Sequence, residues 1–280
     1  MTRKACVIGW PIAHSRSPLI HGYWLKRYGI DGSYERIAVP PAELPDFLGS
    51  LADKAYAGCN VTLPHKEGAF RAVHIADEAT RRLGVVNTVF LRDGGLWGTS
   101  TDGEGFLANL TAHVPDWRAK DRTIVILGAG GAARAIVGAL LDAGSRRLLV
   151  ANRTPARAEE LRRGFGSRVE PRDWRDVGKL LEDADLLVNT TSLGMTGQPP
   201  LALDLTRLPR SAIVTDIVYT PLETALLAEA RARGNVVVPG LGMLLHQAVR
   251  GFELWFGRRP EVTRELHDLV ARDIDPGFER

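Results

Sequence analysis

The chain has few cysteines and no long apolar run. Its 280 residues include two cysteines, Cys6 and Cys59, too few for a disulfide framework and without zinc-finger spacing. We therefore expect reduced thiols in a cytoplasmic protein. No stretch approaches the roughly 18 apolar residues of a membrane span. The N-terminal apolar run is interrupted by Gly9, Pro11 and His14 before a signal-peptide core can form, so we expect no membrane association.

The chain also has a small net charge and few lysines. The 36 basic residues stand against 33 acidic ones, which leaves a net charge of +3. A protein that binds nucleic acid through bulk charge shows clustered Lys and Arg, so we expect no nucleic-acid partner. The length predicts about one or two domains. Only six basic residues are lysines, namely Lys4, Lys26, Lys54, Lys66, Lys120 and Lys179.

Short apolar runs alternate with helical patterns along almost the whole chain. This order predicts repeated βα units, mainly parallel sheets and an α/β fold with two domains. Helices are expected near Pro18 and Ala42, over 103–113, after 131 and beyond Leu241, and a hairpin is expected around Asp93-Gly94-Gly95. Strands are expected at Lys4–Ile8, Tyr34–Val39, Ala57–Leu63, Thr123–Leu127, Leu148–Ala151, Asp185–Asn189, Ile213–Val218 and Val236–Val238.

A glycine-rich turn follows the apolar strand at 123–127. The turn is a variant of GxGxxG in which Ala133 takes the place of the third glycine, and it reads Gly128, Ala129, Gly130, Gly131, Ala132, Ala133. Such a turn lets backbone approach a pyrophosphate, and the N-terminus of the next helix favours the negative charge. A turn that only packs a strand against a helix can have the same composition.

The end of the next strand indicates which dinucleotide binds. NAD sites usually carry Asp or Glu there for the ribose 2′-hydroxyl, whereas this chain has Asn152, Arg153 and Thr154, with Arg157 one turn later. A guanidinium forms charge-assisted bonds to a 2′-phosphate, so NADP is favoured. Thr154-Pro155 also fits an ordinary helix start, and Arg157 also fits a solvated position in an Arg-rich helix.

Polar side chains gather in three further segments. Lys66 follows a strand in Asn-Val-Thr-Leu-Pro-His-Lys, where open α/β sheets place their sites, although a solvated surface lysine is the ordinary alternative. Asp102 stands where the first domain ends, and on the local sequence alone it is simply the N-cap of the next helix. Ser15 and Ser17 can donate to a substrate carboxylate near a helix start, while Ser17-Pro18 also fits an N-cap and N1 pair.

Taken together, these segments resemble the shikimate dehydrogenase family over nearly the whole chain. The matching motifs occur in family order: Gly9-Trp10-Pro11-Ile12, His14-Ser15-Arg16-Ser17-Pro18, Cys59 to Lys66, Val86-Asn87-Thr88, Thr101-Asp102-Gly103, Leu127 to Ala132, Asn152-Arg153-Thr154, Asn189 to Met195, Asp216 to Thr224 and Gly240 to Ala248.

The resemblance implies reversible NADP-dependent oxidation of shikimate to 3-dehydroshikimate, a step of aromatic amino acid (chorismate) biosynthesis. It implies a substrate-binding and catalytic domain of 1–102 and 241–280, a Rossmann-type NADP-binding domain of 103–240, and a cleft between them. Lys66 and Asp102 are then the catalytic acid-base pair, and no metal is required. The implied substrate residues are Ser15, Ser17, Thr62, Asn87, Asp102, Tyr219 and Gln247. The implied cofactor residues are Gly128, Ala129, Gly130, Gly131, Ala132, Asn152, Arg153, Thr154, Arg157, Ile217 and Gly240.

Other interpretations stay open at this point. A quinate/shikimate dehydrogenase that uses NAD belongs to the same superfamily, and a non-catalytic dinucleotide-binding sensor belongs to another class. At this length we expect no second fused enzyme, and we expect the protein to be a monomer or a homodimer. The chain departs from the family at Ser100, Val85 and Gly22, where Asn, Ala and Asn are usual. We expect these departures to tune activity rather than abolish it.

Overall fold

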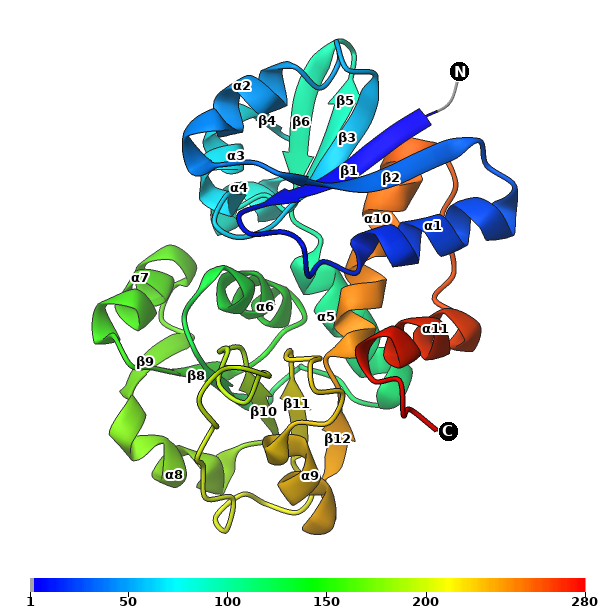
Figure 1. Cartoon of the computed structure of the whole chain (residues 1–280). Coiled ribbons are helices and arrows are strands. Elements are labelled where there is room, and N and C mark those ends of the chain that lie inside the picture. Colours follow the sequence, from blue (N-terminus) through cyan, green and yellow to red (C-terminus); the bar gives the residue numbers. More distant parts are fainter. Residues whose placement is uncertain (1–2, 280) are drawn as a thin grey trace. The chain divides into compact units, whose positions relative to one another are not determined.

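The computed structural model describes residues 3–279. The chain divides into two compact units, Met1–Asp102 with Leu245–Val270 and Gly103–Leu244 with Ala271–Arg280. Each unit is built on a six-stranded sheet with helices packed against it (Figure 1). The predicted α/β fold class is therefore confirmed. The assignment of one unit to substrate and the other to NADP stays a prediction.

The sheet of the first unit is mixed, with strand order β2-β1-β3-β5-β6-β4. Neighbouring strands are parallel except at β3-β5 and β5-β6. The strands are β1 (Arg3–Gly9), β2 (Gly32–Ala38), β3 (Tyr56–Val61), β4 (His74–Ile75), β5 (Thr88–Arg92) and β6 (Gly95–Thr99). The helices are α1 (Ser17–Tyr28), a 3₁₀ turn (Pro41–Glu43), α2 (Leu44–Gly49), α3 (Lys66–Ala72) and α4 (Glu78–Leu83).

The hairpin between β5 and β6 lies where the sequence predicts it. Arg92 pairs with Gly95, so the turn is only Asp93-Gly94, and both residues have positive φ, 52° and 75°. Two positive φ values define the turn type whose twist matches a hairpin, which is why Asp-Gly is favoured there.

A late helix completes the first unit. Helix α10 (Leu241–Phe256) contains Trp255, whose indole N–H donates to the Val89 carbonyl in β5 at 2.9 Å. A Cβ atom at Gly58 in β3 would lie 2.3 Å from the same indole nitrogen, so the close packing requires glycine there. The aromatic residues of α10 are therefore core residues. Helix α11 (Arg264–Ile274) follows.

The sheet of the second unit is parallel throughout, with strand order β12-β11-β10-β7-β8-β9. Read from the other edge, this is the 3-2-1-4-5-6 order of the doubly wound dinucleotide fold. The strands are β7 (Thr123–Leu127), β8 (Arg147–Asn152), β9 (Val169–Asp173), β10 (Leu186–Asn189), β11 (Ile213–Asp216) and β12 (Val236–Val238). The helices are α5 (Asp102–His113), α6 (Gly131–Asp142), α7 (Pro155–Phe165), α8 (Val177–Leu180) and α9 (Ala225–Ala232), with 3₁₀ turns at Trp174–Asp176 and Leu181–Asp183.

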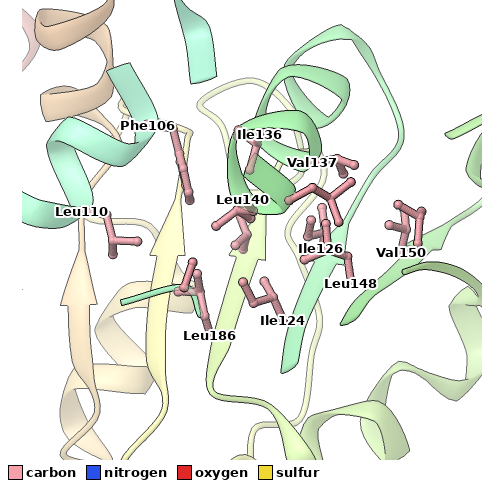
Figure 2. Close-up of a cluster of buried hydrophobic side chains, with 14 of the residues drawn as sticks. Phe106, Leu110, Ile124, Ile126, Ile136, Val137, Leu140, Leu148, Val150 and Leu186 are labelled. Atoms are coloured by element: carbon pink, nitrogen blue, oxygen red, sulfur yellow. The ribbon is translucent and has the colours of Figure 1, made fainter. Parts of the chain in front are cut away.

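The central strand of this sheet is buried on both faces. Ile124 and Ile126 point to one face, where they pack with residues of α5 and α6 such as Phe106 and Leu140 (Figure 2). Val125 and Leu127 belong to a second cluster on the other face, together with residues of α8 and α9. Because side chains alternate along a strand, a run of five apolar residues is what a strand covered on both faces requires. The carboxyl ends of these parallel strands meet at one edge of the sheet.

Candidate active site

A lysine and an aspartate form the centre of the site in the first unit. Lys66 is the first residue of α3, after the turn that ends β3, and Asp102 is the first residue of α5. The Lys66 ammonium donates to Asp102 Oδ2. Only 17% and 9% of the two side chains are exposed, so their attraction is less screened than that of a surface pair. The solvated-lysine alternative is therefore wrong in this fold.

Asn87 fixes the carboxylate from its other side. The Asn87 amide donates to Asp102 Oδ1 at 2.7 Å and to Thr101 Oγ1 at 3.0 Å, and its Oδ1 accepts from the Thr101 N–H at 2.9 Å. Both oxygens of Asp102 are thus engaged by side chains that sequence analysis expected near the substrate. Gln247 joins the cluster, because Asn87 Nδ2 lies 3.4 Å from its Oε1 and the Thr101 hydroxyl donates to its carbonyl at 2.8 Å.

The two serines form a second polar group. The Ser15 hydroxyl lies 3.3 Å from Ser17 Oγ, and it also accepts from the Ser17 N–H. Ser17 is the first residue of α1 rather than its N-cap, since Arg16 holds the cap position without a side-chain bond. The alternative in which Ser17 is the N-cap of this helix is therefore wrong.

Two residues to which the sequence analysis gave no role extend the cluster around Asn87. The Tyr34 hydroxyl donates to Asn60 Oδ1 at 2.6 Å. Asn60 Nδ2 in turn donates to the Asn87 carbonyl at 3.2 Å. Asn60 is a buried polar residue inside an apolar strand, which is a signal that the sequence offered. Tyr34, in β2, gave no such signal.

Thr62 follows β3 and is held by its backbone. Its N–H donates to the Ile8 carbonyl at 3.0 Å, and its carbonyl accepts from the His65 N–H at 2.9 Å. A Cβ atom at Gly9 would lie 2.7 Å from Thr62 Cγ2, so the Gly9 segment approaches Thr62 closely.

Tyr219 belongs to the second unit, in the loop after β11.

The glycine-rich turn has the geometry that a dinucleotide needs. Gly128 has a φ of +104°, and a Cβ atom there would lie 2.6 Å from Thr190 Oγ1. Gly130 and Gly131 face open space, since a Cβ atom at either would meet no atom within 4 Å. Helix α6 begins at Gly131 and has no acidic residue in its first turn. The turn with Ala129 and Ala132 therefore leaves room and positive potential for a pyrophosphate.

The end of β8 presents arginines without acidic partners. The Asn152 amide donates to the Thr154 carbonyl at 2.8 Å, and the Thr154 side chain makes no capping bond to α7. Among residues 3–279, neither the Arg153 nor the Arg157 side chain forms a hydrogen bond or an ion pair, and the first turn of α7 has no acidic residue. Arg162 of the same helix does have a partner, Glu159, at 2.6 Å. The guanidinium groups at the strand end are thus available to an anion.

Two further loops meet at the same edge of this sheet. A Cβ atom at Gly240, after β12, would lie 2.5 Å from the Val218 carbonyl and 2.6 Å from the Ile217 carbonyl. Glycine therefore lets the loop after β12 contact the loop after β11. The expected cofactor residues Ile217 and Gly240 are neighbours in the structure.

Some kinds of site have no counterpart in the part of the chain that is described. From residue 3 to residue 279, no three or more His, Cys, Asp or Glu side chains lie together as metal ligands would. Within the same range, no helix is long and apolar enough to span a bilayer.

Comparison with known proteins follows the same division of the chain. Residues 7–89 match the family described as shikimate dehydrogenase substrate binding domain, residues 110–196 match shikimate / quinate 5-dehydrogenase, and residues 240–264 match the shikimate 5'-dehydrogenase C-terminal domain. The Shikimate dehydrogenase (NADP(+)) of Methylocella silvestris is 57% identical over 272 residues, which cover 97% of both chains.

Solved structures agree with this match. Shikimate 5-dehydrogenase from Thermus thermophilus, in complex with NADP(H) and shikimate, is 38% identical with a TM-score of 0.85, covering 98% of this chain and all of that one. Quinate dehydrogenase from Corynebacterium glutamicum, in complex with NAD, is 30% identical with a TM-score of 0.88, covering 96% and 98%. The fold and the glycine-rich turn define an oxidoreductase of the dinucleotide-dependent class. Within that class, the chain belongs to the shikimate dehydrogenase family.

Proposed function

We propose that this protein catalyses the reversible NADP-dependent oxidation of shikimate to 3-dehydroshikimate, a step of aromatic amino acid biosynthesis. The observation that supports it most directly is the Lys66 and Asp102 pair, oriented by Asn87. The close relative from Methylocella silvestris, named for the same activity with NADP(+), supports it independently.

The pair is suited to moving the proton of a reacting hydroxyl. In the oxidation direction, the hydroxyl proton passes to the pair, and in the reduction direction the Lys66 ammonium returns a proton to the developing alkoxide. Asp102 keeps the ammonium in place, and Asn87 prevents the carboxylate from turning away. When bound, NADP supplies the hydride acceptor.

The other polar residues of the first unit orient the substrate. Ser15 and Ser17, at the start of α1, are placed to donate to the substrate carboxylate, where the helix N-terminus adds positive potential. Thr62, Asn87 and Gln247 are proposed to hold the ring hydroxyls. Tyr219, in the loop after β11, is proposed as a further substrate residue.

The second unit is proposed to hold NADP. The glycine-rich turn fits the pyrophosphate because it is open at Gly130 and Gly131. Arg153 and Arg157 fit the 2′-phosphate because neither side chain is paired with an acidic residue among residues 3–279. Asn152 and Thr154 fit the adjacent ribose. An acid in the place of Arg153 would instead repel the phosphate and favour NAD.

The compartment and the assembly state are proposals of the same kind. Both cysteines, Cys6 and Cys59, are free and buried, which supports a reducing cytoplasmic setting. We propose a monomer or a homodimer, which sedimentation of the purified chain would distinguish.

A steady-state assay of substrate and cofactor specificity tests the proposal. Purified protein is mixed with shikimate or quinate and with NADP or NAD, and formation of the reduced cofactor is followed by absorbance. We expect shikimate with NADP to be the fastest combination and quinate with NAD to be much slower. The reverse order would reassign the chain to quinate oxidation with NAD. Absence of turnover in all four mixtures would support a non-catalytic sensor.

A further inference from the structure

A buried carboxylate in the second unit lies where three segments meet. Asp216 ends β11, and only 1% of its surface is exposed. Its Oδ1 accepts from the Asn189 amide and from the Val218 N–H, each at 3.0 Å, and its Oδ2 accepts from the Thr224 hydroxyl at 2.8 Å. The proposed mechanism does not use this group.

The three donors close a loop around the carboxylate. Val218 and Thr224 belong to the segment that leaves β11 and enters α9, and Thr224 is also the N-cap of α9, accepting from the Leu227 N–H. The carboxylate thus bridges both ends of the loop 217–223. That loop contains Tyr219, which is proposed to contact the substrate.

The third donor extends the same geometry to a second loop. Asn189 ends β10, and its Oδ1 accepts from the Thr191 N–H at 3.0 Å. Backbone bonds join the two loops as well, since the Ile217 N–H donates to the Asn189 carbonyl at 3.1 Å and the Thr196 N–H donates to the Thr220 carbonyl at 2.8 Å. Asp216 is therefore the shared acceptor of both loops.

We infer that Asp216 is a positioning residue, which holds the loop 217–223 so that Tyr219 meets the substrate and Ile217 meets the cofactor. This inference rests on the proposed function. The carboxylate itself touches neither ligand, and its effect passes through the loop. A neutral amide at this position keeps the size but turns one acceptor into a donor, which faces the donors of the loop.

Burial raises the pKa of the Asp216 carboxyl above its ordinary value, because desolvation outweighs the three hydrogen bonds. Folding therefore disfavours the charged form of this carboxyl relative to that of an exposed aspartate. A positioning role predicts that Asp216→Asn impairs kinetics more than it impairs folding.

The test compares Asp216→Asn and Thr224→Val with Asp185→Asn as the matched control. Asp185 lies before β10 at the opposite end of the same sheet, where it accepts from the Thr123 N–H at 2.9 Å. The loss of one hydrogen bond to a charged group corresponds to about a tenfold change in a binding or Michaelis constant. We expect Asp216→Asn to raise the KM for shikimate about tenfold and Thr224→Val to raise it several-fold. Asp185→Asn should leave KM unchanged, although its carboxylate also accepts from a charged donor, Arg122, at 2.8 Å.

A double-mutant cycle with Tyr219→Phe separates positioning from a general loss of structure. If Asp216 acts through Tyr219, the effect of Asp216→Asn on KM shrinks to less than about twofold in the Tyr219→Phe background. The same factor in both backgrounds, or an unchanged KM in Asp216→Asn and Thr224→Val, would overturn the inference. If Asp216→Asn does not fold, Thr224→Val decides alone by the same criterion.

Failure of the proposed function has a different signature. It appears as absence of shikimate turnover in the unmodified protein. In that case the positioning of Ile217 is still tested by NADPH fluorescence titration. Weaker NADPH binding in Asp216→Asn than in Asp185→Asn supports the inference, and equal binding overturns it.

Discussion

Replacing Arg153 by alanine should change cofactor preference rather than catalysis. Arg153 is exposed at the end of β8, and its side chain forms no hydrogen bond or ion pair with any residue from 3 to 279. No internal partner must be given up when it binds an anion. A bond between a guanidinium and a phosphate is charge-assisted, and such bonds contribute about 1.5–3 kcal/mol. Because the group is exposed and screened by salt, we take the lower end of this range.

The expected result is therefore a rise of about tenfold in the KM for NADP, with the KM for NAD unchanged. The assay measures both KM values at saturating shikimate, at low and at moderate salt, and the rise for NADP should be larger at low salt. Arg162→Ala is the matched control, because Arg162 lies in the next helix and is already paired with Glu159. Equal losses for NAD and NADP in Arg153→Ala would refute the assignment of Arg153 to the 2′-phosphate.

Two further predictions concern stability. Burial lowers the pKa of His21 from 6.5 to about 3. Between these two pH values the unfolded chain binds more protons than the folded chain. The free energy of unfolding therefore falls as the pH falls below about 6.5. His21→Phe should reduce the slope of the unfolding free energy against pH by about 1.4 kcal/mol per pH unit. Denaturant titrations at pH 4 to 6 measure this slope, and an unchanged slope would contradict a neutral buried His21. Gly128→Ala should lower the free energy of unfolding by about 1–3 kcal/mol, because φ is +104° and the added Cβ would lie 2.6 Å from Thr190 Oγ1. Gly130→Ala meets no atom within 4 Å and is the control; equal melting temperatures would refute this reasoning.

The sequence predicts the second unit best, because its central strands are buried on both faces and appear as continuous apolar runs. The central strand Thr123–Leu127 has the expected bounds, and so does the edge strand Val236–Val238. Strand β9 was not predicted, since it contains Pro171, lies at the sheet edge and has only Val169 fully buried. Helices α3 and α4 were missed because six or seven residues give no clear period.

The site shows a similar limit. Lys66, Asn87 and Asp102 lie in three separate segments of the sequence. Only the fold brings them into one hydrogen-bonded cluster. Their expected roles came from the family resemblance, which extends residue by residue along the motifs. The link through Tyr34 and Asn60 was not predicted, because it depends on which side chains meet across neighbouring strands. Local spacing contains no information on such contacts.

The central claim is that Lys66 moves the proton during NADP-dependent oxidation of shikimate. The most direct measurement compares kcat and KM for shikimate in Lys66→Arg and in the unmodified protein. Arginine keeps a positive charge beside Asp102 but cannot give up its proton. The account predicts that kcat falls at least about a hundredfold while KM changes much less. A kcat close to that of the unmodified protein, with the loss confined to KM, would contradict it.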